Sequence, residues 1–136
     1  MITINSPEEM EKYYDAKTNT YRFVDEDNKC DDVAFKCNIE VGANIYAWNV
    51  NAQNIDAQNI DACDINALNI NAWNINALTI DAENINARNI DALHIFYYAV
   101  CIAYESFKCK SVTGYRDNAV HMCLDGEIEY KGEEEQ

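Results

Sequence analysis

Residues 43–93 read ANIYAWNVNAQNIDAQNIDACDINALNINAWNINALTIDAENINARNIDAL. A β-branched apolar residue recurs at every fifth position from Ile45 to Val100, which makes twelve positions without an exception. An α-helix repeats its faces about every 3.6 residues and a flat strand every second residue, so neither element explains this period. A fixed internal period of this kind predicts a solenoid, in which each coil of the chain stacks on the one before.

Each unit of the repeat reads Ile, then Asn or Asp, then Ala, then a variable residue, and then usually Asn. The Ile and the Ala stand two positions apart, so both side chains lie on the same side of an extended backbone, and we expect that side to be the interior. The variable residue and the following Asn are expected to form the corner, because Asn tolerates left-handed backbone and bonds its own main chain. Stacking then aligns like residues into columns, and an Asn column can form an amide ladder.

The unit [ND]-I-[ND]-A-x resembles that of the pentapeptide-repeat family, whose members form right-handed quadrilateral β-helices with four repeats per coil. The usual family unit reads A-[DN]-L-x-x, so the large and small inward residues stand in the reverse order in this chain. The resemblance implies coils of about twenty residues and about three coils, which rise roughly 15 Å at a strand spacing of about 4.8 Å. A three-sided coil of about fifteen residues stays open as an alternative. It would stack Trp48, Cys63, Leu78 and Leu93 into one outward apolar column.

The chain also resembles short N-I-[ND]-A-x repeat proteins of Firmicutes and their phages. The similar features are the start SPEE at residues 6–9, the segment YYAVCIAYESFKCKS at 97–111 and the segment LDGEI at 124–128. This second resemblance implies the fold and carries no activity with it.

The length of 136 residues predicts one domain, 1–136, in three parts. An N-terminal cap at 1–42 precedes the repeat at 43–95, and a C-terminal cap with an acidic tail follows at 96–136. Caps are needed because the open sheet edges of a bare solenoid would pair with other chains.

The N-terminal cap carries a helix signal followed by alternating apolar residues. Ser6 as N-cap, Pro7 at the first helical position and Glu9 as capping-box partner predict a short helix from Pro7 to Asp15 that covers a sheet edge. The strands that lead into the first coil are predicted from the alternation of Tyr21, Phe23, Val33, Phe35, Cys37 and Ile39.

The C-terminal cap is expected to begin where large aromatic residues replace the repeat, at His94-Ile95-Phe96-Tyr97-Tyr98. Asp125-Gly126 is the signal of a two-residue hairpin turn, and it stands between the strand-like segments 120–124 and 127–130. The final residues, GEEEQ at 132–136, are predicted to be disordered.

The composition is strongly acidic, with 24 acidic and 10 basic side chains and a formal net charge of -14. Nucleic acid is therefore excluded as a direct ligand because its phosphates would be repelled, whereas a basic protein surface would be attracted. The N-terminus lacks the pattern of a signal peptide, and no apolar segment is long enough for a membrane helix, so no membrane partner is expected. We expect a cytoplasmic protein of a bacterial host cell with its six cysteines reduced.

The chain is not expected to be an enzyme, and no catalytic residues and no cofactor are predicted. Its two histidines, His94 and His121, are the only side chains suited to a general base near neutral pH, and His94 takes the place of a corner Asn. The repeat-borne Asp residues are expected on a convex, solvated surface, where nothing would shift their pKa values. Cys101, Cys109 and Cys123 lie near His121 in sequence but lack the tight C-x2-C pairs of zinc sites, so no metal is predicted.

The first functional hypothesis is an inhibitor that presents DNA-like charge to a nucleic-acid-binding protein. The family resemblance implies this role, because some pentapeptide-repeat proteins mimic DNA toward gyrase, and the phage relatives suggest anti-CRISPR or anti-restriction targets. Duplex DNA carries one charge per about 1.7 Å, so about 15 Å of axis would hold roughly nine. Residues 43–95 carry six acidic side chains and one basic side chain, a net charge of -5, so the caps must contribute the other nine charges of the -14. The acidic candidates for partner contact are Asp56, Asp61, Asp64, Asp81, Glu83 and Asp91.

The alternative hypothesis is a structural scaffold or protein-interaction module, which includes a homodimer. Large apolar side chains occupy the variable, outward position of several units, and clustered exposed Trp and Leu residues mark interfaces. Trp48 and Trp73 are the main candidates for partner contact on this hypothesis, and packing against a cap is the structural alternative. The residues concerned are Trp48, Leu68, Trp73, Leu78 and Leu93.

Overall fold

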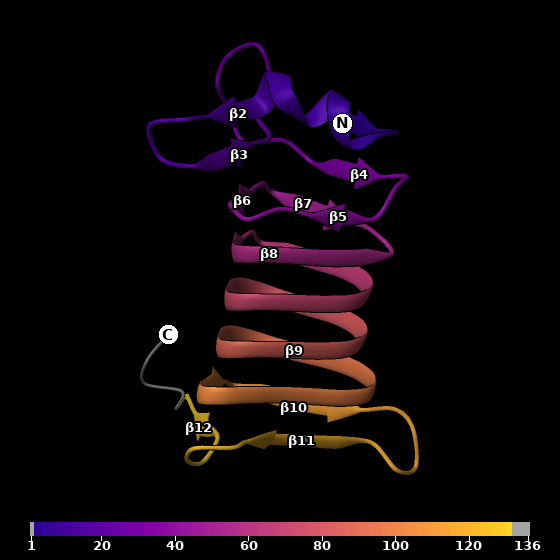
Figure 1. The fold of residues 1–136 in the computed structure, drawn as a ribbon. Helices are drawn as coiled ribbons and strands as arrows, with labels where there is room; N and C mark the ends of the chain where they lie inside the picture. The colour runs from indigo at the N-terminus through magenta and orange to yellow at the C-terminus, as the bar shows by residue number, and fades with distance from the viewer. Residues whose placement is uncertain (1, 132–136) are drawn as a thin grey trace.

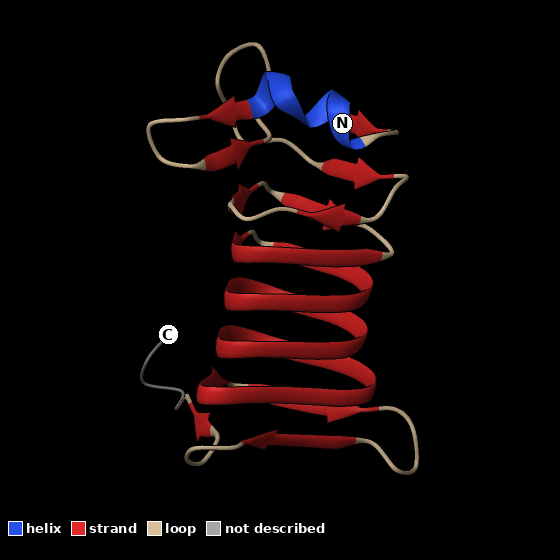
Figure 2. Cartoon of the chain, in the orientation of Figure 1, coloured by secondary structure: helices blue, strands red, loops and turns tan. Residues whose placement is uncertain are grey.

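The computed structural model describes residues 2–131, and it shows a β-solenoid of stacked coils with shorter strands at both ends (Figure 1). Almost every strand pairs in parallel with the strand of the next coil, and within residues 2–131 the one antiparallel strand pair is β2 with β3. The prediction of an all-β solenoid with a short helical element near the N-terminus is confirmed (Figure 2). The predicted disorder of 132–136 concerns residues outside the described range.

The strands divide into a set that builds the N-terminal end and a set that builds the long stack. The first set is β1 (Ile2–Ile4), β2 (Tyr14–Asp15), β3 (Thr20–Arg22), β4 (Val33–Phe35), β5 (Ile39–Glu40), β6 (Asn44–Tyr46) and β7 (Asn49–Asn51). The second set is β8 (Asn54–Asp61), β9 (Asp64–Cys109), β10 (Ser111–Gly114), β11 (Val120–Cys123) and β12 (Glu129–Tyr130). Strand β9 runs through several coils because its corner residues stay extended.

The coil has three sides. Pairing of β6 with β8 places Ile45 beside Ile60, and pairing of β8 with β9 places Ile60 beside Ile75 and Ile55 beside Ile70. Each of these pairs is separated by three five-residue units. The four-sided coil implied by the pentapeptide-repeat resemblance is therefore wrong for this chain, and the three-sided alternative is confirmed.

The interior consists of the predicted Ile and Ala columns. Ile55, Ile70 and Ile85, which stack on one side, are each exposed by 2% or less, and every repeat Ala from Ala47 to Ala92 is buried. Burying each Ile stabilises the fold by about 1.5–3 kcal/mol, and one coil buries three of them. A coil of three units has a narrow interior that one Ile and one Ala per side can fill without larger residues.

The three corners differ in their outward residues, and we number them in chain order. Corner 1 follows the side of Ile45, corner 2 follows the side of Val50, and corner 3 follows the side of Ile55. The variable residues are Trp48, Cys63, Leu78 and Leu93 at corner 1, Gln53, Leu68 and Glu83 at corner 2, and Gln58, Trp73 and Arg88 at corner 3.

Corners 2 and 3 carry the predicted Asn ladders. At corner 3 the Asn74 Nδ2 donates to the Asn59 Oδ1, and the Asn89 Nδ2 donates to the Asn74 Oδ1 at 2.6 Å. At corner 2 the Asn69 Nδ2 donates to the Asn54 Oδ1 at 2.6 Å. Every amide in both ladders donates toward the N-terminal end, so each internal member gives one hydrogen bond and receives one.

The N-terminal helix differs from its prediction in type, length and capping. Element η1 (Pro7–Tyr13) is a 3-10 helix and stops short of Asp15. The Ser6 side chain makes no capping hydrogen bond, and the Glu9 Oε2 instead accepts from the Asn5 N–H at 2.7 Å. The capping box predicted between Ser6 and Glu9 is therefore wrong. A 3-10 helix rises about 2.0 Å per residue against about 1.5 Å for an α-helix, which changes the alignment that the Ser6 hydroxyl would need.

The N-terminal cap still covers the end of the stack, as predicted (Figure 1). Met10 of η1 is 2% exposed and belongs to the core together with Phe23 and Phe35. The rings of Phe23 and Phe35 meet edge to face, with centroids 5.3 Å apart. These large side chains occupy the interior where the smaller Ile and Ala columns end.

The C-terminal cap continues the solenoid instead of forming a hairpin. Strands β11 and β12 both pair in parallel with β9, with Val120 beside Val100 and Glu129 beside Lys108. The hairpin predicted around Asp125-Gly126 is therefore wrong, and this dipeptide lies at a corner of the last coil. A turn signal is local, whereas the choice of strand partner depends on which edge the preceding coil leaves open.

The repeat also lengthens at this end. Inward positions are buried at Tyr97, Cys101 and Phe107, whereas Val100 is only half-buried. The twelfth position predicted from the period, Val100, is therefore not the inward residue, because the corner after Tyr97 holds one more residue than the regular corners.

Candidate functional site

The three-sided coil gathers four apolar residues into one outward column at corner 1, which we call the Trp48 column. The Cys63 N–H donates to the Trp48 carbonyl and the Leu78 N–H to the Cys63 carbonyl, both at 2.8 Å, so these residues lie on successive coils. Trp48, Leu78 and Leu93 are exposed by 53%, 51% and 36%. Four coils at about 4.8 Å spacing give the column a length of about 14 Å.

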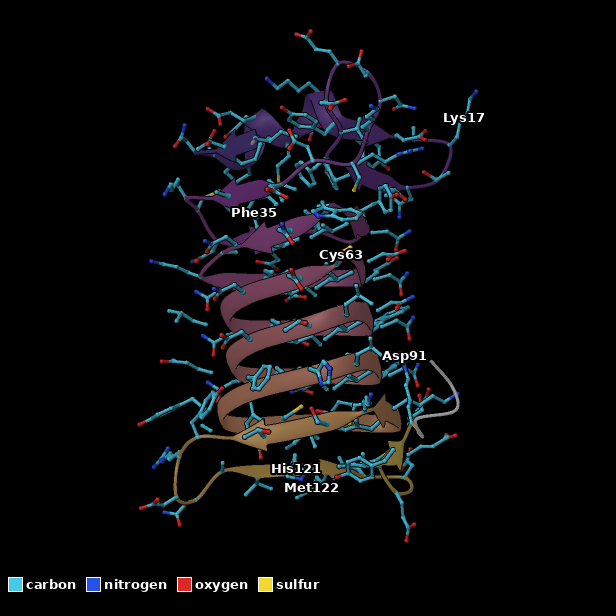
Figure 3. The ribbon with its side chains drawn as sticks, turned by 180° about the vertical axis from the view of Figure 1, so that it is seen from behind. Lys17, Phe35, Cys63, Asp91, His121 and Met122 are labelled. Atoms are coloured by element: carbon cyan, nitrogen blue, oxygen red, sulfur yellow. The ribbon has the colours of Figure 1, made fainter. Side chains whose placement is uncertain are left out.

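Two carboxylates flank the middle of the Trp48 column. Asp61 and Asp64 stand on either side of Cys63 on the same coil. Burial raises the pKa of the Cys63 thiol, and the charges of Asp64 and Asp61 raise it further. Figure 3 shows Cys63 and Asp91 on the same side of the stack as seen from behind. Asp91 forms an ion pair with the Lys131 ammonium at the C-terminal end.

The other predicted acidic residues do not join this group. Asp56 lies on the side of Ile55 beside Glu40, and Asp81 follows Ile80 on the side of Ile65. Glu83 belongs to corner 2. The six predicted carboxylates are therefore spread over three sides and two corners, and the repeat itself presents no continuous acidic face.

Trp73 is separated from Trp48, although sequence analysis grouped the two residues. It lies at corner 3, is 52% exposed, and has the Arg88 guanidinium carbon 4.8 Å from its ring centroid. Leu68, 44% exposed, lies at corner 2. The predicted outward apolar residues therefore divide among three corners, and only corner 1 holds several of them in line.

A shallow hollow of about 440 Å³ lies on the side of Ile45, below the hairpin of β2 and β3. Thr20, Arg22, Tyr46 and Asp61 are among the residues that line it, and the Arg22 guanidinium carbon is 5.5 Å from the Tyr46 ring centroid. Sequence analysis missed Arg22, because β3 reaches this side only through its pairing with β6. The hollow is open and contains no nucleophile paired with a base among the residues that line it.

The C-terminal end buries Cys101, Cys109 and Cys123, whereas His121 is exposed and His94 is half-buried. Burial raises the pKa of the Cys101 thiol to about 12 and that of the Cys109 thiol to about 11. The buried Tyr97 hydroxyl and the His121 Nδ1 are 2.6 Å apart. Within residues 2–131, no three His, Cys, Asp or Glu side chains are placed to hold a metal ion together. His94 takes the corner Asn position and contacts the Ser111 Oγ at 2.8 Å.

Comparison with protein-family models, with curated proteins and with solved structures finds no match to this chain. In the described part of the chain, no helix has the length and apolar character needed to cross a membrane.

Proposed function

We propose that this chain is a non-enzymatic binding protein whose partner is a basic protein surface, and that the Trp48 column is the centre of the contact. The observation that carries the proposal is an exposed apolar column about 14 Å long, in which Cys63 has Asp61 and Asp64 as near neighbours in the sequence. Exposed Trp and Leu residues in line favour a protein interface, since single exposed apolar residues are common and need no explanation.

The scaffold suits this role because it holds the column rigid. The backbone on either side of corner 1 is bonded to neighbouring coils, as the Trp48, Cys63 and Leu78 main-chain bonds show. Binding would therefore cost this protein little conformational entropy, since the outward residues of the column are already aligned. The net charge of -14 adds long-range attraction for a basic surface and speeds association.

The proposal is tested by affinity capture from an extract of the native cells, with the partner quantified by mass spectrometry. The double variant Leu78→Ser with Leu93→Ser should lose the captured partner, because it removes two of the three large side chains in the column. Leu68→Ser is the matched control, since Leu68 is equally apolar and 44% exposed at corner 2. Equal capture by both variants would overturn the column as the contact.

Inhibition by DNA mimicry is a second candidate, and the net charge of -14 favours it. Because the repeat spreads its carboxylates over three sides, a mimic would need the acidic residues of the caps as well. Once a partner is identified, duplex DNA should displace this protein from it, and binding should weaken steeply with salt. Asp56→Lys with Asp81→Lys should slow association on this hypothesis, and binding indifferent to DNA and salt would exclude it.

A further inference from the structure

The two ends of the solenoid are built differently. At the N-terminal end η1 lies across the stack and buries Met10, whereas β11 is the last strand at the other end (Figure 1). Within residues 2–131, β10, β11 and β12 each pair with β9 and with no other strand. One edge of β11 therefore has no strand partner in this part of the chain, and we call it the open edge.

The backbone groups at the open edge belong to His121 and Cys123. The Leu124 N–H donates to the Ala103 carbonyl at 2.9 Å, so the backbone groups of Leu124 are directed toward β9. Successive residues of a strand direct their N–H and C=O groups to opposite edges. The N–H and C=O groups of Cys123 and His121 therefore point to the open edge.

The side chains of this segment do not protect the open edge. Edge strands of natural proteins commonly carry charged residues, proline or a bulge, which discourage pairing with another chain. Residues 120–124 read VHMCL and contain no Asp, Glu, Lys, Arg or Pro. The outward residues are exposed by 42% at Val120, 38% at Met122 and 53% at Leu124. Figure 3 shows His121 and Met122 at the end of the stack.

The interior is also less covered at this end than in the regular coils. There the inward Ile and Ala side chains are exposed by 8% or less. His121 lies beside the buried Cys101 and therefore faces inward, but its side chain is exposed. Tyr130 lies beside the buried Cys109 and is 55% exposed. A partner placed on this end would cover both side chains.

The charge distribution makes this end the part of the chain at which a second copy is repelled least. Residues 96–131 carry five acidic and four basic side chains, a net charge of -1. Residues 2–95 carry sixteen acidic and six basic side chains, a net charge of -10, and the other three acidic residues lie at 133–135, outside the described range. Contact through the C-terminal end keeps the two strongly acidic parts of a pair of copies farthest apart.

We propose that the open edge binds a second copy of this chain, with β11 antiparallel to β11 of the partner subunit around a two-fold axis. An axis at right angles to the side of β11 turns the second stack end for end and keeps its inward side chains in line with the first interior. The free backbone groups then match. His121 exchanges two hydrogen bonds with Cys123 of the partner subunit, and Cys123 exchanges two with the partner's His121.

The order of side chains in residues 120–124 favours a second copy over an unrelated strand. The apolar residues Val120 and Leu124 stand symmetrically about Met122. In this register Val120 lies opposite Leu124 of the partner subunit, and the two Met122 side chains meet on the axis. Each exposed outward residue thereby gains an apolar neighbour, and such cross-strand pairs stabilise antiparallel sheets.

The experiment is sedimentation equilibrium of the full chain in reductant. The mass should rise with concentration from 15.5 kDa to twice that value, and salt should strengthen the dimer because it screens the repulsion between two acidic copies. Met122→Lys should weaken the dimer about tenfold, because two like charges would face each other at close range. Leu68→Lys is the matched control, since Leu68 is 44% exposed at corner 2, and it should dimerise like the unchanged chain.

The register is tested by oxidative cross-linking. The two Met122 Cα atoms should lie about 4.5 Å apart, within the range of a disulfide, so Met122→Cys should give a covalent dimer under mild oxidation. Val120→Cys is the control, because four residues separate the two copies of position 120, roughly 13 Å, and no disulfide can form. The unchanged chain measures the background from its six native cysteines.

A single species of 15.5 kDa at every concentration and at high salt would overturn the inference. A dimer that Met122→Lys leaves unchanged, or equal cross-linking of Val120→Cys and Met122→Cys, would also exclude this contact. If the chain stays monomeric but Met122→Lys abolishes capture of another protein, the open edge takes a foreign strand and the second copy is excluded.

Discussion

The regular coils at 43–95 and the last coils at 96–131 share parallel pairing but differ in how they fill the interior. In the regular coils every side contributes one Ala and one Ile, or Val50 in the first coil, and like residues stack on like. In the last coils Tyr97 takes an Ala position, and Gly114 of the following coil lies beside it. The Tyr97 side chain is 1% exposed, so it fills the interior near the C-terminal end.

This difference shows what sets the length of a coil. Where the units are alike and small, residues fifteen positions apart stay side by side from coil to coil, as the hydrogen bond between the Asn59 and Asn74 amides shows. After Tyr97 the bulkier inward residues are accompanied by longer corners, and Ser111 lies seventeen positions after His94. The terminal coil thereby closes the core with a different set of residues, and the regular column of Asn amides does not continue through it.

The largest effect is expected from Ile70→Asp in the regular coils. Ile70 is 2% exposed, and an unpaired carboxylate in its place would cost several kcal/mol in addition to the roughly 1.5–3 kcal/mol lost with the Ile side chain. The variant should not fold, as measured by circular dichroism. Asn71→Ser, at the neighbouring outward position, should change the melting temperature little. A folded Ile70→Asp protein with an unchanged melting temperature would contradict the interior column.

Tyr97→Ala tests the last coils in the same way. Removing a large buried aromatic side chain should lower the free energy of unfolding by about 3–5 kcal/mol, because a cavity is left beside Gly114. Chemical denaturation measures the loss, and Tyr98→Ala is the control, since Tyr98 is 51% exposed. Equal losses from both variants would mean that Tyr97 does not close the core.

Gly114→Ala tests whether the fit around Tyr97 is tight. A Cβ atom at this position would lie 2.5 Å from the Ala119 Cβ and 2.8 Å from the Tyr97 Oη. Overpacking of this kind should lower the free energy of unfolding by about 1–3 kcal/mol. Gly42→Ala, where a Cβ would meet nothing within 4 Å, should have little effect in the same denaturation experiment. Stability unchanged by Gly114→Ala would show that the last coil adjusts freely.

Asn74→Ala tests the regular ladder. Asn74 gives one ladder hydrogen bond to Asn59 and receives one from Asn89, so the variant should lose about 1–2 kcal/mol. Asn49→Ala at corner 1 should lose less, because Asn49 makes one side-chain bond and its Oδ1 is unpaired among the described residues. Thermal unfolding of both variants compares the two corners directly. A larger loss of stability from Asn49→Ala than from Asn74→Ala would contradict a stabilising role of the ladder.

The smallest effect is an alkaline loss of stability that comes from the last coils. Burial raises the pKa of the Cys101 thiol from 9.0 to about 12, so the unfolded chain releases this proton at lower pH than the folded chain. Folding stability should therefore fall as pH rises above 9, by about 1 kcal/mol per thiol at pH 10. Cys101→Ala with Cys109→Ala should lessen this decline in denaturation curves measured from pH 8 to pH 10. An identical decline in the variant would assign it to other groups.

The five-residue unit was enough to predict the class of fold and which positions face the interior. Ile and Ala point inward because the side on which a residue of an extended backbone lies is a local property. The Asn residues form the predicted ladders between coils, but the left-handed backbone expected at these corners is wrong, since positive φ among the described non-glycine residues occurs only at Asn19 and Asn28. The same reasoning failed at the ends, where the Ser6 capping box and the Asp125-Gly126 hairpin were wrong. Those signals are local too, but there the neighbouring coil determined the geometry.

The number of units in one coil, and with it every contact between coils, became known only from the pairing of the strands. The unit reads the same in a three-sided or a four-sided coil, because the number of sides depends on how many Ile and Ala side chains fill one cross-section. That number placed Cys63 beneath Trp48 and Arg88 beneath Trp73. It also spread the six predicted carboxylates around the solenoid, so the candidate site emerged as a column at one corner instead of an acidic face.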